Sequence, residues 1–178
     1  MGRAHLPPTV GAAPGTGRYR VAVTDPAWPT AQRFPLLSEE AMARWSRYIR
    51  PDRRFFPTFV GLQVEELRAG YTRLRLPLRP EICQGTGVVH GGAISTLIDT
   101  VAVPSIGTYY SQQADMLTIS MTVNFVGVVD GEDAIGEGWV EQAGRSVAFV
   151  RAEVRGVSGE LAASGSLGVR VRLRDGAD

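Results

Sequence analysis

The sequence is poor in the residues that build disulfides and zinc sites. It contains one cysteine, Cys83, and two histidines, His5 and His90. A disulfide needs a second cysteine, and a structural zinc ion is usually held by cysteine and histidine side chains. We therefore expect neither a disulfide framework nor a cysteine- or histidine-rich metal site, and no cluster of acidic residues suggests a carboxylate site in its place.

The chain also lacks an excess of charge and a long uninterrupted apolar run. Lysine and arginine number 19 against 18 acidic residues, a net charge of +1, so bulk electrostatics favour neither nucleic acid nor an anionic membrane. The N-terminus has no secretory apolar core, and Asp99, Pro104 and several hydroxyl residues interrupt the apolar stretch 94–106. We predict a cytoplasmic protein that binds neither nucleic acid nor membrane.

Composition and length are those of one globular domain with an appendage. The 178 residues are 44% hydrophobic and 21% charged, which is ordinary for a single core. Residues 1–54 are predicted to form an N-terminal extension, because the stretch up to about residue 37 is rich in Pro, Gly and Ala without a sustained period. The main domain is expected over residues 55–173, with a tail at 174–178.

One helix is predicted in the extension, near residues 38–50. Ser38 is an N-cap candidate, and Glu39 and Glu40 in the first turn suit the helix dipole. The same segment and the residues after it carry a basic edge, formed by Arg44, Arg47, Arg50, Arg53 and Arg54. We interpret this edge as a solvated face; the alternative is a contact for a phosphorylated ligand.

From about residue 59 the apolar residues recur with a period of two. The stretches "GLQVEEL" and "YTRLRLPLR", joined by "RAG", predict a hairpin with leucines on one face and arginines on the other. Four more strand candidates follow later in the chain: "DMLTISMTVNFVG", in which apolar residues alternate with Thr, Ser and Asn, "DAIGEGWVEQA", "RSVAFVRAEVRG" and "ELAASGSLGVRVRL". The order predicts an α+β fold in which an antiparallel sheet of about six strands packs on one central helix.

The central helix is the stretch "VVHGGAISTLIDT", residues 88–100, and its continuation. Asp99 is the only formal charge between Ile82 and Ala114, and a buried unpaired carboxylate is costly enough to indicate a function. A helix with so little charge should be buried on most sides. Pro104 is expected to end or kink it near the last turn. The apolar stripe at helical spacing comprises Ile94, Leu97, Ile98, Val101 and Ala102.

Gly91 and Gly92 lie where this helix begins, so their N–H groups have no intrahelical acceptor and sit at the positive end of the dipole. Without Cβ atoms they allow a ligand oxygen to approach, which suits the oxyanion of an acyl-transfer intermediate. Asp99 follows Gly91 by eight residues, which is about 12 Å along a helix. If both groups act on one substrate they come from two chains, and a two-fold dimer with antiparallel helices would bring them together.

The stretch "HGGAISTLIDT", preceded by a polar residue at Gln84 and followed by the strand pattern above, resembles the hotdog-fold thioesterases. The likeness is greatest to the PaaI-like group, named for phenylacetyl-CoA thioesterase, and covers about residues 57–172. It implies a hotdog fold and hydrolysis of acyl-CoA thioesters without metal or cofactor. It also implies a homodimer or dimer of dimers whose sites lie at the dimer interface.

The resemblance implies a role for each matching residue. The Gly91 N–H would bind the oxyanion, with His90 shaping the helix start. Asp99 of the partner would be the general base or the nucleophile, and Thr118 matches a hydroxyl that helps to orient the attacking water. Gln84 stands where the group usually has Asn, and its longer side chain would bind the carbonyl or the water.

Two further residues are expected at the substrate, and one is not. Gly92 lets the substrate approach the helix start, and Arg145, in the turn "AGRS", lies where CoA phosphates often rest in hotdog folds; a solvated arginine is the alternative. Cys83 is interpreted as a small core residue, because no third member of a Cys83–His90 triad is evident.

Two other functions stay open from the sequence alone. A 3-hydroxyacyl thioester dehydratase would also use a histidine and a carboxylate, here His90 and Asp99, although the two glycines after His90 favour an oxyanion hole. A non-catalytic acyl-CoA-binding protein would share the fold without turnover, since one fold hosts many functions. Such a sensor normally needs an effector module, and the extension shows no convincing helix-turn-helix.

Overall fold

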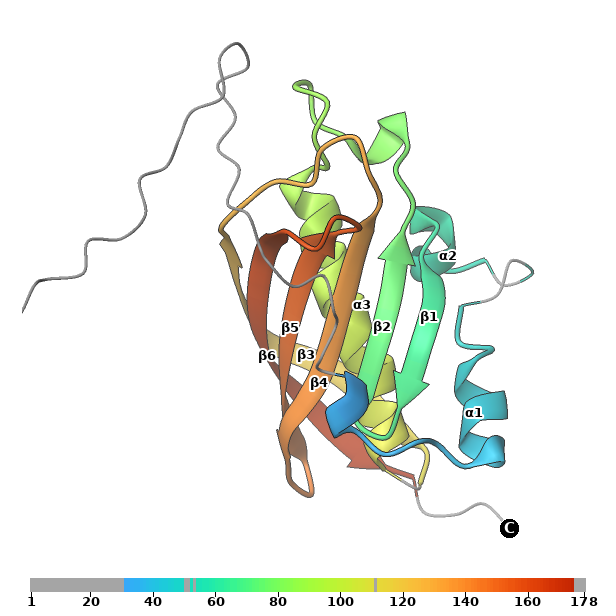
Figure 1. Ribbon diagram of the computed structural model, residues 1–178. Helices are drawn as coiled ribbons and strands as arrows, with labels where there is room; N and C mark the ends of the chain where they lie inside the picture. The colour runs from blue at the N-terminus through green and yellow to red at the C-terminus, as the bar shows by residue number, and fades with distance from the viewer. Residues whose placement is uncertain (1–30, 50–51, 53, 111, 175–178) are drawn as a thin grey trace, which may run out of the picture.

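The computed structural model describes residues 31–49, 52, 54–110 and 112–174 (Figure 1). Two short helices come first, followed by a hairpin, one long helix and four further strands. Their bounds are α1 (Glu39–Trp45), α2 (Phe56–Val60), β1 (Gln63–Arg68), β2 (Tyr71–Leu76), α3 (Gly91–Tyr109), β3 (Ala114–Phe125), β4 (Ala134–Ala143), β5 (Val147–Gly156) and β6 (Leu161–Leu173), with 3-10 turns at Ala31–Arg33 and Pro80–Ile82.

All six strands form one antiparallel sheet in the order β1-β2-β4-β5-β6-β3. The sheet curves around α3, which packs along its concave face (Figure 1). The predicted architecture, an antiparallel sheet wrapped round one central helix, is therefore confirmed. Strand β3 follows α3 directly in the chain but lies at the far edge of the sheet, beside β6.

The predicted apolar stripe of α3 is the centre of the core. Its residues are buried and pack against inward-facing side chains of the sheet. The helix comes so close to β4 that a Cβ at Gly136 would lie 2.5 Å from Cγ of Leu97. Only glycine fits there, so a glycine-rich strand lets the helix approach the sheet closely.

Of the two effects predicted for Pro104, an end of the helix is wrong, because α3 continues to Tyr109. Proline removes one helical hydrogen bond, but the residues after it are buried, and Ile106 is fully enclosed. The hydroxyl of Ser105 lies 2.7 Å from the carbonyl oxygen of Val101 and 2.9 Å from that of Gly138. Packing and this link to β4 outweigh the lost bond.

Helix α1 begins as predicted, since the Ser38 Oγ accepts the Ala41 N–H at 3.2 Å, but it ends at Trp45. It packs on the C-terminal half of α3, where a Cβ at Gly107 would lie 1.8 Å from the Trp45 ring. Part of the predicted extension is thus joined to the main domain.

In the basic edge, Arg44 pairs with Glu40 at 3.0 Å; Arg50 and Arg53 lie outside the described residues.

The regular alternation expected in β3 is interrupted by a bulge between Thr118 and Ser120. A bulge adds one residue to one strand, so the side chains beyond it change face. Met116, before the bulge, and Val123, beyond it, therefore both pack against the core although their spacing is odd, whereas Leu117 and Ile119 are exposed.

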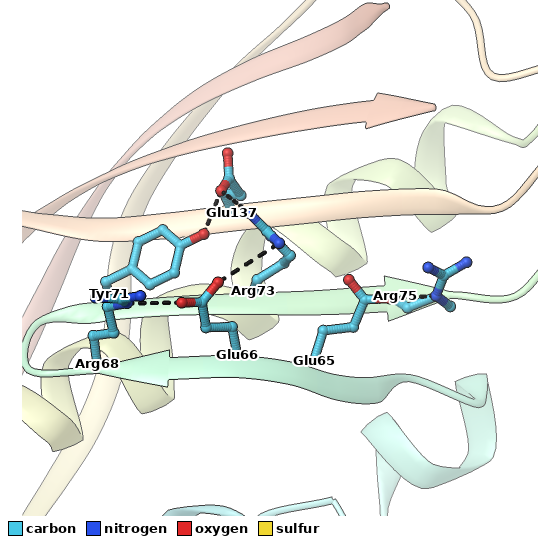
Figure 2. Close-up of polar contacts among 7 residues, drawn as sticks. All are labelled: Glu65, Glu66, Arg68, Tyr71, Arg73, Arg75 and Glu137. Atoms are coloured by element: carbon cyan, nitrogen blue, oxygen red, sulfur yellow. Dashed lines mark hydrogen bonds and ion pairs between the residues drawn. The ribbon is translucent and has the colours of Figure 1, made fainter. Parts of the chain in front are cut away.

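A buried polar cluster lies on the outer face of the sheet, on β2 and β4 (Figure 2). Tyr71 and Glu137 are 0% and 1% exposed, and the Tyr71 hydroxyl donates to the Glu137 carboxylate. Arg73 donates to the same carboxylate at 3.2 Å, and the Phe34 ring stacks on Tyr71 at 5.4 Å. Burial raises the pKa of Glu137 above its ordinary 4.5, although Tyr71 and Arg73 oppose the shift.

We predict that Glu137 makes folding stability pH-dependent. The native state holds the Glu137 proton more tightly than the unfolded chain, so its contribution is fully present below pH 4.5 and is lost as pH rises through the raised pKa. Urea unfolding of the wild type and of Glu137→Gln from about pH 4 to about pH 8 measures this. The stability of the wild type relative to the variant should fall with pH; a constant difference would contradict the prediction. The exposed Glu39→Gln serves as control.

Candidate active site

His90 caps the start of α3. Its Nδ1 accepts the N–H of Gly92 at 2.8 Å, and its own backbone N–H donates to the carbonyl of Ile82 at 2.8 Å. Because Nδ1 is an acceptor, the ring proton is on Nε2. The expectation that His90 shapes the helix start agrees with this geometry.

The N–H of Gly91 has no acceptor in the part of the chain that the structure describes. It is the first residue of α3, where backbone donors have no intrahelical partner and the helix dipole is positive. The Phe125 ring lies 3.4 Å from the position of a Cβ on Gly91, so one side of the site is apolar. This donor is available to an oxygen of a ligand.

Asp99 lies two turns further along α3 and faces β3. The Thr118 hydroxyl donates to its Oδ1 at 2.8 Å, and the carboxylate is half-buried. No basic side chain pairs with it among residues 31–49, 52, 54–110 and 112–174. The structure thus brings together Asp99 and Thr118, to which the family resemblance gave roles in one reaction.

Among the described residues, neither Gln84 nor Arg145 forms a hydrogen bond or an ion pair with the helix start at Gly91 or with Asp99. Gln84 is exposed in the turn before α3, where its side-chain amide donates to the Thr86 hydroxyl at 3.0 Å. The turn that carries Arg145 lies at the opposite end of α3, because the Tyr110 hydroxyl donates to the Gly144 carbonyl at 2.6 Å. Eighteen residue steps separate the two ends of α3, a distance of about 27 Å.

Sequence reasoning missed α2 and the cavity that it covers. The cavity measures about 310 Å³ and lies between α2, residues 79–83 and the first turns of α3. The stretch "FPTFVG" contains the residues that mark a short helix. Pro57 stands near the start of α2, and Gly61 ends it in the left-handed conformation, with φ 84°. Cys83 also lines this cavity; its Sγ donates to the Arg79 carbonyl at 3.3 Å and it packs against the core.

Within one chain the candidate groups form two separate clusters on α3. His90, Gly91 and Gly92 are at its start, and Asp99 with Thr118 is about 12 Å along the axis. The arrangement can bind a carbonyl oxygen at one place and activate water at the other.

Residues 31–49, 52, 54–110 and 112–174 contain no group of three or more His, Cys, Asp or Glu that could hold a metal ion. Among the same residues no helix is both long and apolar enough to cross a membrane.

We predict that His90→Ala destabilises the fold by about 1 kcal/mol, because the Gly92 N–H loses its capping acceptor. His90→Asn should cost less, since an asparagine side chain also caps a helix start. Equilibrium urea unfolding measures both variants. Equal losses in the two variants would show that the ring contributes by packing and not as a cap.

Comparison with known proteins gives a consistent picture. A family model described as thioesterase superfamily matches residues 86–163, which include Gly91, Asp99 and Thr118. A protein of Halobacterium salinarum named "Putative esterase VNG_1336C" is 30% identical over 102 residues, which are 54% of this chain and 67% of that protein.

Solved structures share the fold. A mutant of the phenylacetic acid degradation protein PaaI from Thermus thermophilus is 22% identical, with a TM-score of 0.59 over 65% of this chain and 96% of that chain. A hypothetical thioesterase from Streptococcus pneumoniae, solved with coenzyme A, is 15% identical, with a TM-score of 0.59 over 65% of this chain and 89% of that chain. These likenesses confirm the predicted hotdog fold.

Proposed function

Because this chain belongs to the thioesterase superfamily, we propose that it hydrolyses an acyl-CoA thioester to the free acid and CoA. The observation that carries the proposal is the pair of clusters on α3: an amide donor without an acceptor at Gly91, and a carboxylate held by a hydroxyl at Asp99. The presence of coenzyme A in the Streptococcus pneumoniae structure supports CoA as the thiol part of the substrate.

In the proposed reaction the thioester carbonyl oxygen accepts the Gly91 N–H. As the carbonyl carbon is attacked, negative charge develops on this oxygen and is stabilised by the amide and by the dipole of α3. Asp99 takes a proton from a water that attacks the carbon, or attacks the carbon itself to form a mixed anhydride that water then hydrolyses. The C–S bond breaks and CoA leaves as the thiolate, which is then protonated.

The two clusters would act on one substrate only across a dimer. Two α3 helices packed antiparallel about a two-fold axis would place Asp99 of one chain near Gly91 of the other. Strand β3 supports this pairing, because it is an edge strand whose Met121 and Phe125 are exposed, and the Phe125 ring lies against Gly91. Long apolar edges rarely remain unpaired in solution.

The remaining residues have supporting roles in the proposal. His90 holds the helix start in place, Gly92 leaves room for the substrate, and Thr118 orients Asp99 or the water. Gln84 and Arg145 remain predicted contacts for the carbonyl and the CoA phosphates. A cytoplasmic location likewise remains a prediction.

The proposal predicts that Gly91→Pro lowers kcat by about 10²–10³ in a thiol-release assay over a panel of acyl-CoAs. Proline is well tolerated at the first position of a helix and removes only the N–H in question. Gly91→Ala keeps the N–H and is the matched control, with turnover expected within a few-fold of the wild type. Asp99→Asn should lower kcat by about 10²–10⁴. Wild-type rates in Gly91→Pro or Asp99→Asn would refute the assigned roles.

The dimeric site is tested by pairing the two defects. Chains with Asp99→Asn and chains with Gly91→Pro, carrying different affinity tags, are co-expressed and the mixed dimer is isolated. One of its two sites then has both groups intact, so it should recover about half of the wild-type activity. A mixed dimer as inactive as either parent would place both groups of a site on one chain.

A further inference from the structure

The cavity beside the start of α3 has apolar walls. Gly92, Ala93 and Thr96 form its α3 side, and Phe59 of α2 faces them with 79% of its surface exposed. Cys83 lies in the wall between the two helices. An exposed phenylalanine at the mouth of an apolar cavity is typical of a surface that receives an apolar ligand.

Arg79 is the one arginine or lysine in the cavity wall, and one of its nitrogens holds α2 in place. Arg79 donates from Nη2 to the carbonyl oxygens of Phe59 and Val60, at 3.0 and 2.7 Å, and its Nε lies 4.0 Å from Glu81. The guanidinium thereby fastens the C-terminal end of α2 over the cavity. Its Nη2 is thereby engaged with α2, and most of the residues around it in the cavity wall are apolar, which favours an acyl group over the phosphates of CoA.

The cavity and Asp99 both border the exposed face of α3, on which Thr96 of the cavity wall and Asp99 are about one turn apart. Asp99 faces β3 through Thr118, whereas Ala93 and Thr96 face α2. The Gly91 N–H at the helix start is next to Gly92, which lines the cavity. A thioester whose carbonyl oxygen binds this N–H can therefore direct one substituent into the cavity.

We infer that this cavity is the acyl-binding pocket and that Phe59 is a specificity-determining residue. The inference rests on the proposed thioesterase function and names its substrate class. A volume of about 310 Å³ holds roughly ten groups of the size of a water molecule, at about 30 Å³ each. A methylene group is of similar size, so a medium-chain or phenyl-bearing acyl group fills the pocket, whereas acetyl leaves most of it empty.

Cys83 provides a direct probe, because it is the only cysteine of the chain and lines the cavity. The rate of its alkylation by iodoacetamide is measured in full-length Asp99→Asn protein, which keeps the thioester intact. The ligands are CoA, acetyl-CoA, octanoyl-CoA and phenylacetyl-CoA, each at a concentration that calorimetry shows to be saturating. Octanoyl-CoA and phenylacetyl-CoA should slow alkylation by about tenfold or more, and CoA should change it by less than about twofold.

The outcomes separate the pocket from the proposed function. Equal protection by CoA alone would place the CoA arm in the cavity and overturn the inference. Binding of octanoyl-CoA without protection would overturn it and leave hydrolysis standing, whereas absence of any acyl-CoA binding would overturn both. Protection by the larger acyl groups in a protein whose wild type shows no thiol release would support the pocket and refute the thioesterase.

Two phenylalanines of α2 give a matched pair of variants. Phe59 lines the cavity and Phe56, 59% exposed on the same helix, does not. Phe59→Ala should lower kcat/KM for octanoyl-CoA relative to acetyl-CoA by about tenfold, because an apolar wall is lost. Phe56→Ala should leave that ratio within about twofold. Equal effects of the two substitutions, or no change with Phe59→Ala, would show that Phe59 does not select the acyl group.

Discussion

The close packing of α3 against the glycine-containing strand β4 is the contact on which the rest of the structure depends. Leu97 occupies the space that a side chain at Gly136 would fill, and the sheet wraps the apolar stripe of the helix. This contact fixes the direction of α3, and with it the place of the Gly91 N–H and of Asp99. The long helix continues through Pro104 for the same reason, because its last turns are enclosed by the sheet.

The candidate site is divided by the length of a helix. The Gly91 N–H and the Asp99 carboxylate lie on one rigid helix. They are too far apart to contact the same carbonyl group. That separation makes association the simplest way to complete the site, and the exposed apolar residues of β3 are consistent with it. The same helix start also borders the cavity that we propose for the acyl group, so one structural feature would serve recognition and chemistry.

Much of the fold was predictable because its signals are local. A period of two marked the hairpin and much of β3, turn residues separated the other strand candidates, and the uncharged stretch after His90 marked the central helix. The helix-start chemistry of Gly91 follows from backbone geometry that any helix shares. The proximity of Thr118 to Asp99 came from the family resemblance, and the structure brings the two together at 2.8 Å.

The sequence by itself determined the order of the elements, the apolar stripe of α3 and the position of its single carboxylate, because these depend on neighbours within a few residues. Only the tertiary structure decided that β3 changes face at its bulge and that α2 encloses a cavity beside His90. It also decided that the Phe34 ring stacks on Tyr71, whose hydroxyl donates to the buried Glu137 carboxylate. Each of these arises from contacts between segments far apart in the chain, and periodicity along the chain carries no information about such contacts.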